Sequence, residues 1–180
     1  MLEDERLIWE LKHGDKEALR QVYMKYKDNL LTIAASLLHD ACTAEDVLHD
    51  VFVSFAASVG RLELRVSLRN YLMASVVNRV RDRCRKKKLH IVDLDKAGQI
   101  GLDSDGPVQS AIFAEESQLL ADALFQLPLE QRETIILHLN GGMKFKEIAE
   151  VQRIGLSTVQ GRYRYGLEKL RTILSGESKK

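Results

Sequence analysis

Helical periodicity runs through almost the whole chain, and it limits the fold more than any other feature. Apolar residues recur at steps of three and four positions, the spacing of one face of an α-helix, while strand-like alternation is nearly absent. Glycine and proline are confined to a few positions that punctuate the pattern. We therefore predict an all-α protein.

The periodicity is lost over residues 89–112, which are rich in Gly, Asp and Ser and contain the first proline. We interpret 91–112 as a flexible linker. The flanking parts, 1–90 and 113–176, are each long enough to bury over half of their unfolded surface. The sequence thus predicts two small domains, an N-terminal helical bundle and a C-terminal helix-turn-helix domain.

Local signals predict where helices of the first domain begin. Asp15 is placed to cap the second helix. Thr43 followed by Asp46 resembles a capping box, which predicts a third helix over 44–59. A fourth is expected over 67–88, and its buried stripe consists of Leu68, Leu72, Val76 and Val80.

In the second domain, Pro128 suits the first turn of a helix. Two helices of about 8 and 18 residues follow, over 145–152 and from about Leu156, joined by a tight turn that contains Gly155. This is the outline of a helix-turn-helix. The expected apolar face of the last helix is Val159, Tyr163, Leu167, Leu170 and Leu174.

The net charge of +1 conceals two basic blocks, +8 over 61–90 and +5 over 151–180, with acidic stretches between them. Such separation favours two surfaces that meet a polyanion. On the fourth helix, a rotation of 100° per residue groups polar, aromatic and basic residues opposite the apolar stripe: Tyr71, Asn78, Arg81, Asp82, Arg85, Lys86, Lys87 and Lys88. This face suits unpaired bases and phosphates, although a solvated helix end is the alternative.

Two further faces are candidates for binding. Opposite the apolar residues of the third helix lie Asp46, His49, Asp50 and Val53, which indicates either a protein contact or an ordinary surface. The residues of the last helix that could reach DNA are Ser157, Thr158, Gln160, Arg162, Arg164 and Tyr165.

Catalytic and metal-binding motifs are missing from the sequence. The five histidines are scattered, and the two cysteines have no partner at metal-ligand spacing. We expect a binding protein without a cofactor, metal or catalytic residue rather than an enzyme. No apolar run is long enough to cross a membrane and the N-terminus is acidic, so we expect no membrane insertion, no export and a cytoplasmic location.

Four segments carry a resemblance to the bacterial sigma factors of the extracytoplasmic-function group. AEDVLHDVF at 44–52 resembles the segment that docks on core RNA polymerase, and YLMASVVNRVRDRCR at 71–85 resembles the promoter-melting segment. ALFQLPLEQRETIILHLNGGMKFKEIAEV at 123–151 and TVQGR at 158–162 resemble the domain that reads the upstream promoter element. Their order and spacing make the resemblance specific.

The resemblance implies roles for the candidate residues. Asp46 and Asp50 would face the clamp helices of the polymerase β′ subunit, and Asn78 with loop residues such as Arg65 would capture a flipped base of the minus-ten element. Arg81, Arg85 and Lys86 to Lys88 would hold phosphates, and Thr158, Arg162 and Arg164 would contact the minus-thirty-five element. The β flap would be a second contact on the polymerase, and the linker would run toward the RNA exit path. An anti-sigma protein would be a further partner, which the sequence does not identify.

The chain departs from the family pattern in the turn of the helix-turn-helix. Gln152 and Arg153 replace the common Leu-Gly, and we therefore expect the turn to depend on Gly155. Other departures are Tyr71 for Trp, His49 for Gln and Gly161 for Ser.

Two other functions are compatible with the residues alone. A free-standing helix-turn-helix regulator would bind duplex DNA as a dimer and use 1–90 for dimerisation or sensing. An interaction protein would use its basic helix to bind an acidic partner.

Overall fold

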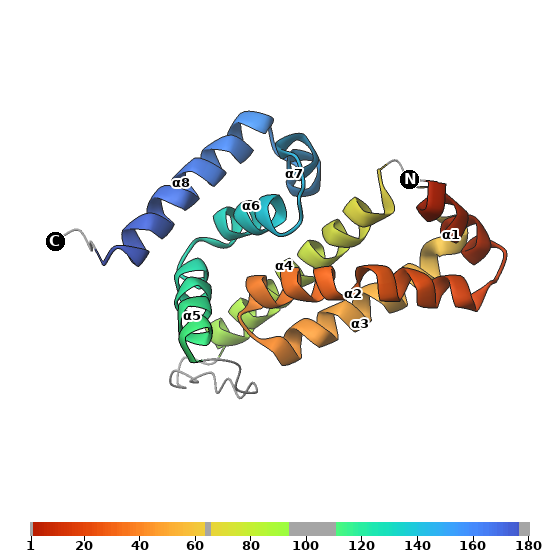
Figure 1. Ribbon diagram of the computed structural model, residues 1–180, viewed down its shortest axis with the longest axis horizontal. Helices are drawn as coiled ribbons and strands as arrows, with labels where there is room; N and C mark the ends of the chain where they lie inside the picture. The colour runs from red at the N-terminus through yellow and green to blue at the C-terminus, as the bar shows by residue number, and fades with distance from the viewer. Residues whose placement is uncertain (1, 64–65, 94–110, 177–180) are drawn as a thin grey trace.

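The computed structural model describes residues 2–63, 66–93 and 111–176, apart from the side chains of Leu2, 87–93 and 111–117. Within these ranges the chain forms helices and turns, with no strand, which confirms the all-α prediction. The elements of the first domain are α1 (Leu2–Lys12), α2 (Lys16–Leu38), α3 (Ala41–Ser58), the 3-10 turn η1 (Val59–Arg61) and α4 (Leu68–Asp93). Those of the second are α5 (Ala111–Phe125), α6 (Leu129–Leu139), α7 (Phe145–Gln152) and α8 (Leu156–Leu174). Figure 1 shows α1 and α8 at opposite ends of the molecule.

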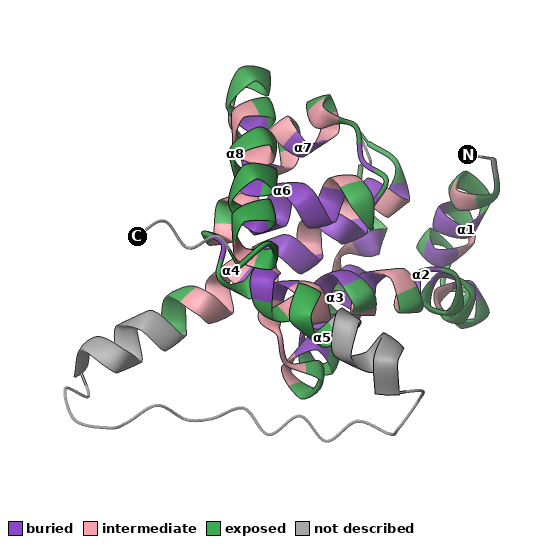
Figure 2. Ribbon diagram, turned by 60° about the vertical axis from the view of Figure 1, so that its left-hand side comes forward, coloured by how far each residue is buried: buried purple, intermediate pink, exposed green. Residues whose placement is uncertain are grey.

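Helices α2, α3 and α4 pack against one another to form the core of the first domain. The predicted stripe of α4 is buried, with each of Leu68, Leu72, Val76 and Val80 at most 1% exposed. Figure 2 shows how buried residues gather on the facing sides of the helices. Burying one such side chain stabilises the fold by about 1.5–3 kcal/mol, so this stripe fixes α4 firmly. The opposite face of α4 is thereby held toward solvent.

The cap of α2 was predicted correctly and that of α3 was not. The carboxylate of Asp15 accepts a hydrogen bond from the backbone N–H of Glu17 at 2.8 Å. Helix α3, however, begins at Ala41, and its cap is Asp40, which accepts from the backbone N–H of Cys42 at 3.0 Å. The hydroxyl of Thr43 donates to the same carboxylate. Because Asp40 satisfies the first N–H groups, Thr43 lies inside the first turn and the predicted capping box with Asp46 does not form.

Hydrogen bonds between polar side chains connect α1 to α2. The hydroxyl of Tyr26 lies 2.8 Å from both carboxylate oxygens of Asp4, and Lys25 donates to Asp4 at 2.8 Å and to Glu3 at 2.6 Å. Burial opposes ionisation of Asp4, but the hydrogen bonds from Lys25 and Tyr26 outweigh it and lower the pKa of Asp4. Burial and the bond to Asp4 raise the pKa of Tyr26 to about 12.

The helix-turn-helix is present, formed by α7 and α8, but its turn differs from the expected one. Arg153 takes the left-handed conformation with φ 55°, whereas Gly155 is extended and precedes α8. The backbone N–H of Ile154 donates to Ala149 at 3.0 Å, which closes the end of α7. This bonding offsets the roughly 1 kcal/mol that a left-handed non-glycine residue costs, so the turn depends on Arg153 and not on Gly155.

The buried face of α8 also differs from the prediction. Val159, Gly166 and Leu170 are buried, whereas Leu167 is 36% exposed and Leu174 52% exposed. Gly166 lies against α6, since a Cβ there would come within 2.9 Å of Ile135 Cδ1. A glycine carries no apolar side chain, so the periodicity of side chains could not reveal this contact.

The two domains pack against each other. Helices α5 and α6 contact α2, and apolar residues of the second domain join the core of the first: Ile136, Leu137, Met143, Ile148 and Val159. A smaller cluster of Ala123, Leu127, Ile135 and Leu170 holds α5, α6 and α8 together. Helix α4 extends to Asp93 and α5 begins at Ala111, so both helices reach into the predicted linker 91–112, which is shorter than expected. The remainder of that linker, 94–110, lies outside the described residues.

Candidate nucleic-acid and protein interfaces

A cleft of about 310 Å³ between α3 and α4 brings together three of the residues predicted to bind single-stranded DNA. Tyr71, Asn78 and Asp82 line this α3/α4 cleft together with Val51, Ser54, Phe55, Ser75 and Arg79. The ring of Tyr71 is half-buried and its centroid lies 6.1 Å from that of Phe55, while Asn78 is exposed. The cleft therefore combines an anchored aromatic ring with a free amide, which are the groups that bind an unpaired base.

Basic side chains border this cleft at Arg79 and, next to Asp82, at Arg85. Arg79 donates to the hydroxyl of Ser54 at 2.9 Å, and Arg85 pairs with Asp82 at 3.0 Å. Lys86 is exposed beyond them. Sequence reasoning missed the α3 side of the cleft, since only packing in three dimensions brings Ser54 beside α4. Arg65 and the side chains of Lys87 and Lys88 lie outside the described residues.

Arg81 lies apart from these residues, on the flank of α4 that faces the second domain. Its Nε donates to Glu133 Oε1 at 2.9 Å, and its Nη2 donates to Glu133 Oε2. Burial raises the pKa of Glu133, and the hydrogen bonds from Arg81 offset only part of this effect. The same bonds raise the pKa of Arg81, so the arginine stays charged.

The predicted protein-binding face of α3 divides between the two edges of the helix. Asp46 and Asp50 turn toward α4, where they lie 3.4 and 3.6 Å from the guanidinium of Arg83. His49 and Val53 line a groove between α2 and α3 instead. All four residues reach solvent at least in part, so the face is accessible as predicted.

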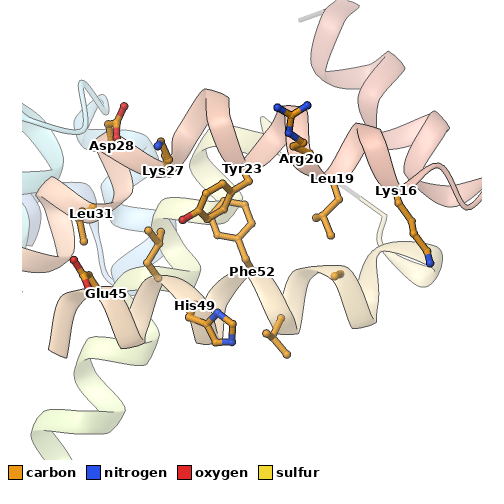
Figure 3. A pocket seen from close by; sticks show the side chains of 13 residues that line it. Lys16, Leu19, Arg20, Tyr23, Lys27, Asp28, Leu31, Glu45, His49 and Phe52 are labelled. Carbon is orange, nitrogen blue, oxygen red and sulfur yellow. The ribbon is translucent and has the colours of Figure 1, made fainter. Parts of the chain in front are cut away.

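The α2/α3 groove has a volume of about 630 Å³ and an apolar floor. Figure 3 shows the rings of Tyr23 and Phe52 side by side within it, with centroids 4.9 Å apart. Basic residues of α2 line one side: Lys16, Arg20 and Lys27. Sequence reasoning missed this half of the groove, because Tyr23 belongs to the apolar stripe of its helix yet is 38% exposed.

The last helix presents most of its predicted DNA-binding residues to solvent: Ser157, Thr158, Gln160, Arg164 and Tyr165 are exposed. The guanidinium of Arg164 lies 4.8 Å from the ring centroid of Tyr165 and donates to its hydroxyl at 3.0 Å. Arg162 is only half-exposed. Its Nη1 donates to Gln152 Oε1 at 2.8 Å, so this arginine is engaged within the protein.

The described part of the chain offers neither a metal site nor a membrane-spanning helix. Its His, Cys, Asp and Glu side chains form no group of three that could hold a metal ion. None of its helices is long and apolar enough to cross a membrane.

Comparison with known families gives two matches in chain order. Residues 22–90 match the family Sigma-70 region 2, and residues 117–170 match Sigma-70, region 4. The matches coincide with α2 to α4 and with the four helices of the second domain. Together they cover the α3 face, the α3/α4 cleft and the helix-turn-helix.

Similar proteins and structures agree with these matches. The chain is 27% identical to the ECF RNA polymerase sigma factor SigW of Bacillus subtilis, over 93% of this chain and 94% of that protein. It is 28% identical to the RNA polymerase sigma factor CarQ of Myxococcus xanthus, over 91% of this chain and 92% of that protein. Its fold is similar to that of CnrH in complex with the cytosolic domain of CnrY, with a TM-score of 0.74, 23% identity and coverage of 98% and 99%. Its fold is also similar to that of the sigma factor RpoE in complex with the anti-sigma factor NepR from Bartonella quintana. Here the TM-score is 0.71, the sequence identity is 22%, and the match covers 87% of this chain and 96% of that chain.

Proposed function

Since the chain belongs to the extracytoplasmic-function sigma factors, which direct the initiation of transcription by RNA polymerase, we propose that it binds core polymerase through α3 and opens promoters through the α3/α4 cleft. It does no covalent chemistry itself and acts in the cytoplasm, where polymerase and promoter DNA meet. Its domains are 1–90 for docking and melting and 113–176 for upstream recognition, with 91–112 between them.

The α3/α4 cleft carries this proposal. A regulator that reads only duplex DNA needs a helix for the major groove, and α8 supplies one. It has no need of Tyr71 and Asn78 beside a row of cations in the other domain. A protein that extrudes a base needs that combination, because a base cannot be read by a pocket while it remains stacked.

The first domain has two binding surfaces, one for polymerase and one for promoter DNA. Asp46, His49, Asp50 and Val53 contact the clamp helices of the β′ subunit, with the acidic pair directed at cations of the partner. Asn78 hydrogen-bonds to a flipped base of the minus-ten element, and Tyr71 supports the stacked strand. Arg65, Arg81, Asp82, Arg85 and Lys86 to Lys88 position the strand, mostly through its phosphates.

The second domain reads the minus-thirty-five element. Ser157, Thr158 and Gln160 are close to the N-terminus of α8, where side chains reach base edges in the major groove. Arg162, Arg164 and Tyr165 contact phosphates beside them. The same domain contacts the β flap of the polymerase. Because two structures of similar fold contain a sigma factor or CnrH bound to another protein, an anti-sigma protein is a further partner that we propose.

Size-exclusion chromatography with core polymerase that lacks a sigma subunit tests the proposal. Co-elution is expected, together with weak binding of a labelled promoter duplex by the chain alone. Specific duplex binding without co-elution would instead identify a free-standing helix-turn-helix regulator. If neither occurs, the chain is an interaction protein of another kind.

A further inference from the structure

The exposed side of α8 has a gap in its row of side chains. At 100° per residue, Ser157, Thr158, Gly161 and Tyr165 lie on one side of the helix, and Gly161 leaves the middle of this side bare. The buried residues of α8 lie on the opposite side. Figure 1 shows α8 on the outside of the second domain, with α6 on its inner side. The bare turn is therefore open to a partner that approaches from solvent.

The ring of Tyr165 extends back along α8 to this bare turn. Its Cε2 lies 3.9 Å from the position that a Cβ would have at Gly161. Long side chains on a helix point toward its N-terminus, so Tyr165 covers the surface one turn before its own Cα. The ring is thereby placed nearer the start of α8, and the start of a recognition helix is the part that reaches base edges.

Arg164 engages the polar end of Tyr165. Its guanidinium lies 4.8 Å from the ring centroid and donates to the hydroxyl oxygen at 3.0 Å. The hydroxyl keeps its own proton, which it can donate to a phosphate. The hydroxyl is the only polar group of a tyrosine side chain, and Tyr165 is 54% exposed. What the side chain still offers to a base is therefore the carbon surface of its ring.

The major groove of DNA presents one apolar group to such a ring, the C5-methyl of thymine. The other groups on the base edges are hydrogen-bond donors and acceptors, which ring carbons do not satisfy. The glycine at 161 favours the contact, because a backbone without a side chain approaches a ligand closely. Ser157 and Thr158 carry hydroxyl groups, which both donate and accept and therefore discriminate less between bases.

We propose that Tyr165 determines specificity in the upstream promoter element, by placing its ring against the C5-methyl of a thymine. This inference rests on the proposed function. It adds a selected base to the phosphate contact of the same side chain, since the hydroxyl and the ring bind different groups. Arg164 acts beside it as the residue that holds the hydroxyl and meets the neighbouring phosphate.

Replacement of thymidine by 2′-deoxyuridine tests the contact, because it removes only the methyl group. Promoters are first selected by the holoenzyme, reconstituted from the full chain and core polymerase, from a duplex library randomised over the upstream element. Each thymidine of the selected element is then replaced in turn. At one position we expect binding to weaken by about three- to fivefold, which is the contribution of one buried methyl group.

Three variants assign this methyl effect to a side chain. Tyr165→Ala should bind the thymidine and deoxyuridine duplexes equally, whereas Tyr165→Phe keeps the ring and should retain the preference. Leu167→Ala is the matched control, because it removes an exposed apolar side chain from another side of α8 and should also retain the preference. Circular dichroism checks that the variants are folded, and the replacement series on the unaltered chain is decisive even if Tyr165→Ala is not.

The inference is overturned if no thymidine responds to loss of its methyl group, or if the response persists in Tyr165→Ala. Equal loss of affinity for both duplexes in Tyr165→Phe and Tyr165→Ala would restrict Tyr165 to phosphate and would also overturn it. The same selection with the chain alone separates the two proposals. If the chain alone shows the methyl effect and no holoenzyme forms, the proposed function fails and the thymine contact stands. If neither form selects a sequence, both fail.

Discussion

Asp46 on α3 and Arg83 on α4 form an ion pair at 3.4 Å, which joins the predicted polymerase-binding face to the predicted DNA-binding helix. Asp50 lies 3.6 Å from the same guanidinium. The pairs are substantially exposed and therefore contribute at most about 1 kcal/mol to stability. Their presence means that a charge reversal on α3 affects its neighbours on α4 as well as a partner protein.

We predict that Asp46→Arg with Asp50→Arg lowers the affinity for core polymerase by at least about tenfold, because it reverses the charge that meets cations of the partner. Fluorescence titration with labelled protein measures this affinity. Glu5→Arg with Glu63→Arg is the matched control, since both positions are exposed and the change in net charge is equal. Equal losses in the two double variants would place the polymerase contact elsewhere.

His49→Ala with Val53→Ala tests the same face without disturbing the pairs to Arg83. These side chains line the α2/α3 groove. Polymerase affinity should fall by several fold, since both side chains lose their contacts with the partner. The free energy of unfolding should change by less than about 0.5 kcal/mol, because both side chains are exposed. Unaltered affinity would restrict the docking face to the acidic edge of α3.

Asn78→Ala should reduce the fraction of open promoter complexes by about tenfold, because one hydrogen-bonded contact to a base contributes about 1–3 kcal/mol of discrimination. Permanganate footprinting of unpaired thymines measures this fraction. Polymerase affinity should remain at the wild-type value, since Asn78 lies in the α3/α4 cleft and not on the α3 face. Arg81 is left intact in this experiment because its removal would also leave the buried carboxylate of Glu133 without its arginine partner. A loss of polymerase affinity instead would contradict the assigned role of the cleft.

The helices could be predicted from the sequence because they depend on neighbours three and four positions away. The stripe of α4 and the cap at Asp15 are of this kind, and both were correct. The face of α8 was partly wrong because Gly166 is buried without an apolar side chain. The cap of α3 was wrong because Asp40 precedes the pattern that suggested Thr43.

The interface between the domains could not be predicted, because its polar residues look like ordinary surface residues in sequence. The buried carboxylate of Glu133 has its hydrogen-bond donors on α4 and α7, at positions far away in the sequence. Gln152 did carry a signal, since it departs from the family pattern at that position. Sequence alone offered no reason for this departure, and the structure supplies one in the bond to Arg162.

Tyr26→Phe should lower the free energy of unfolding by about 1 kcal/mol at pH 7, because it removes the hydroxyl that donates to Asp4. Urea unfolding measures the difference, and Tyr23→Phe, at an exposed position on the same helix, should change stability by less than about 0.5 kcal/mol. Equal effects of the two substitutions would show that the hydroxyl of Tyr26 contributes nothing specific.

The loss of stability caused by Tyr26→Phe should become smaller both at low pH and at high pH. The folded state lowers the pKa of Asp4 below 3.8, so the stabilising contribution is present above pH 3.8 and is lost as the pH falls through the folded value. The folded state raises the pKa of Tyr26 from 10.0 to about 12, so its contribution is present below pH 10 and is lost as the pH rises toward 12. The difference between wild type and variant should therefore be largest between these limits.

Two glycines of α8 should respond oppositely to substitution. A Cβ at Gly161 would come no nearer than 3.9 Å to Tyr165, so Gly161→Ala should stabilise the helix by about 0.5–1 kcal/mol. At Gly166 a Cβ would lie 2.9 Å from Ile135 and 3.3 Å from Gln131, so Gly166→Val should destabilise the protein by about 1–3 kcal/mol. Thermal unfolding of both variants checks the pair, and destabilisation by Gly161→Ala would contradict the open surroundings of that position.

Arg164→Ala should make promoter binding by the assembled holoenzyme less dependent on salt. The logarithm of the affinity falls as the logarithm of the salt concentration rises. If Arg164 neutralises one phosphate, its removal makes this slope less steep by about 0.9. Arg171→Ala is the control, because Arg171 lies on the same face of α8 but seven residues nearer its C-terminal end. Filter binding across a range of salt concentrations gives both slopes. In this geometry only the start of α8 enters the major groove. A less steep salt dependence for Arg171→Ala with an unchanged one for Arg164→Ala would therefore mean that the C-terminal half of α8 contacts the DNA.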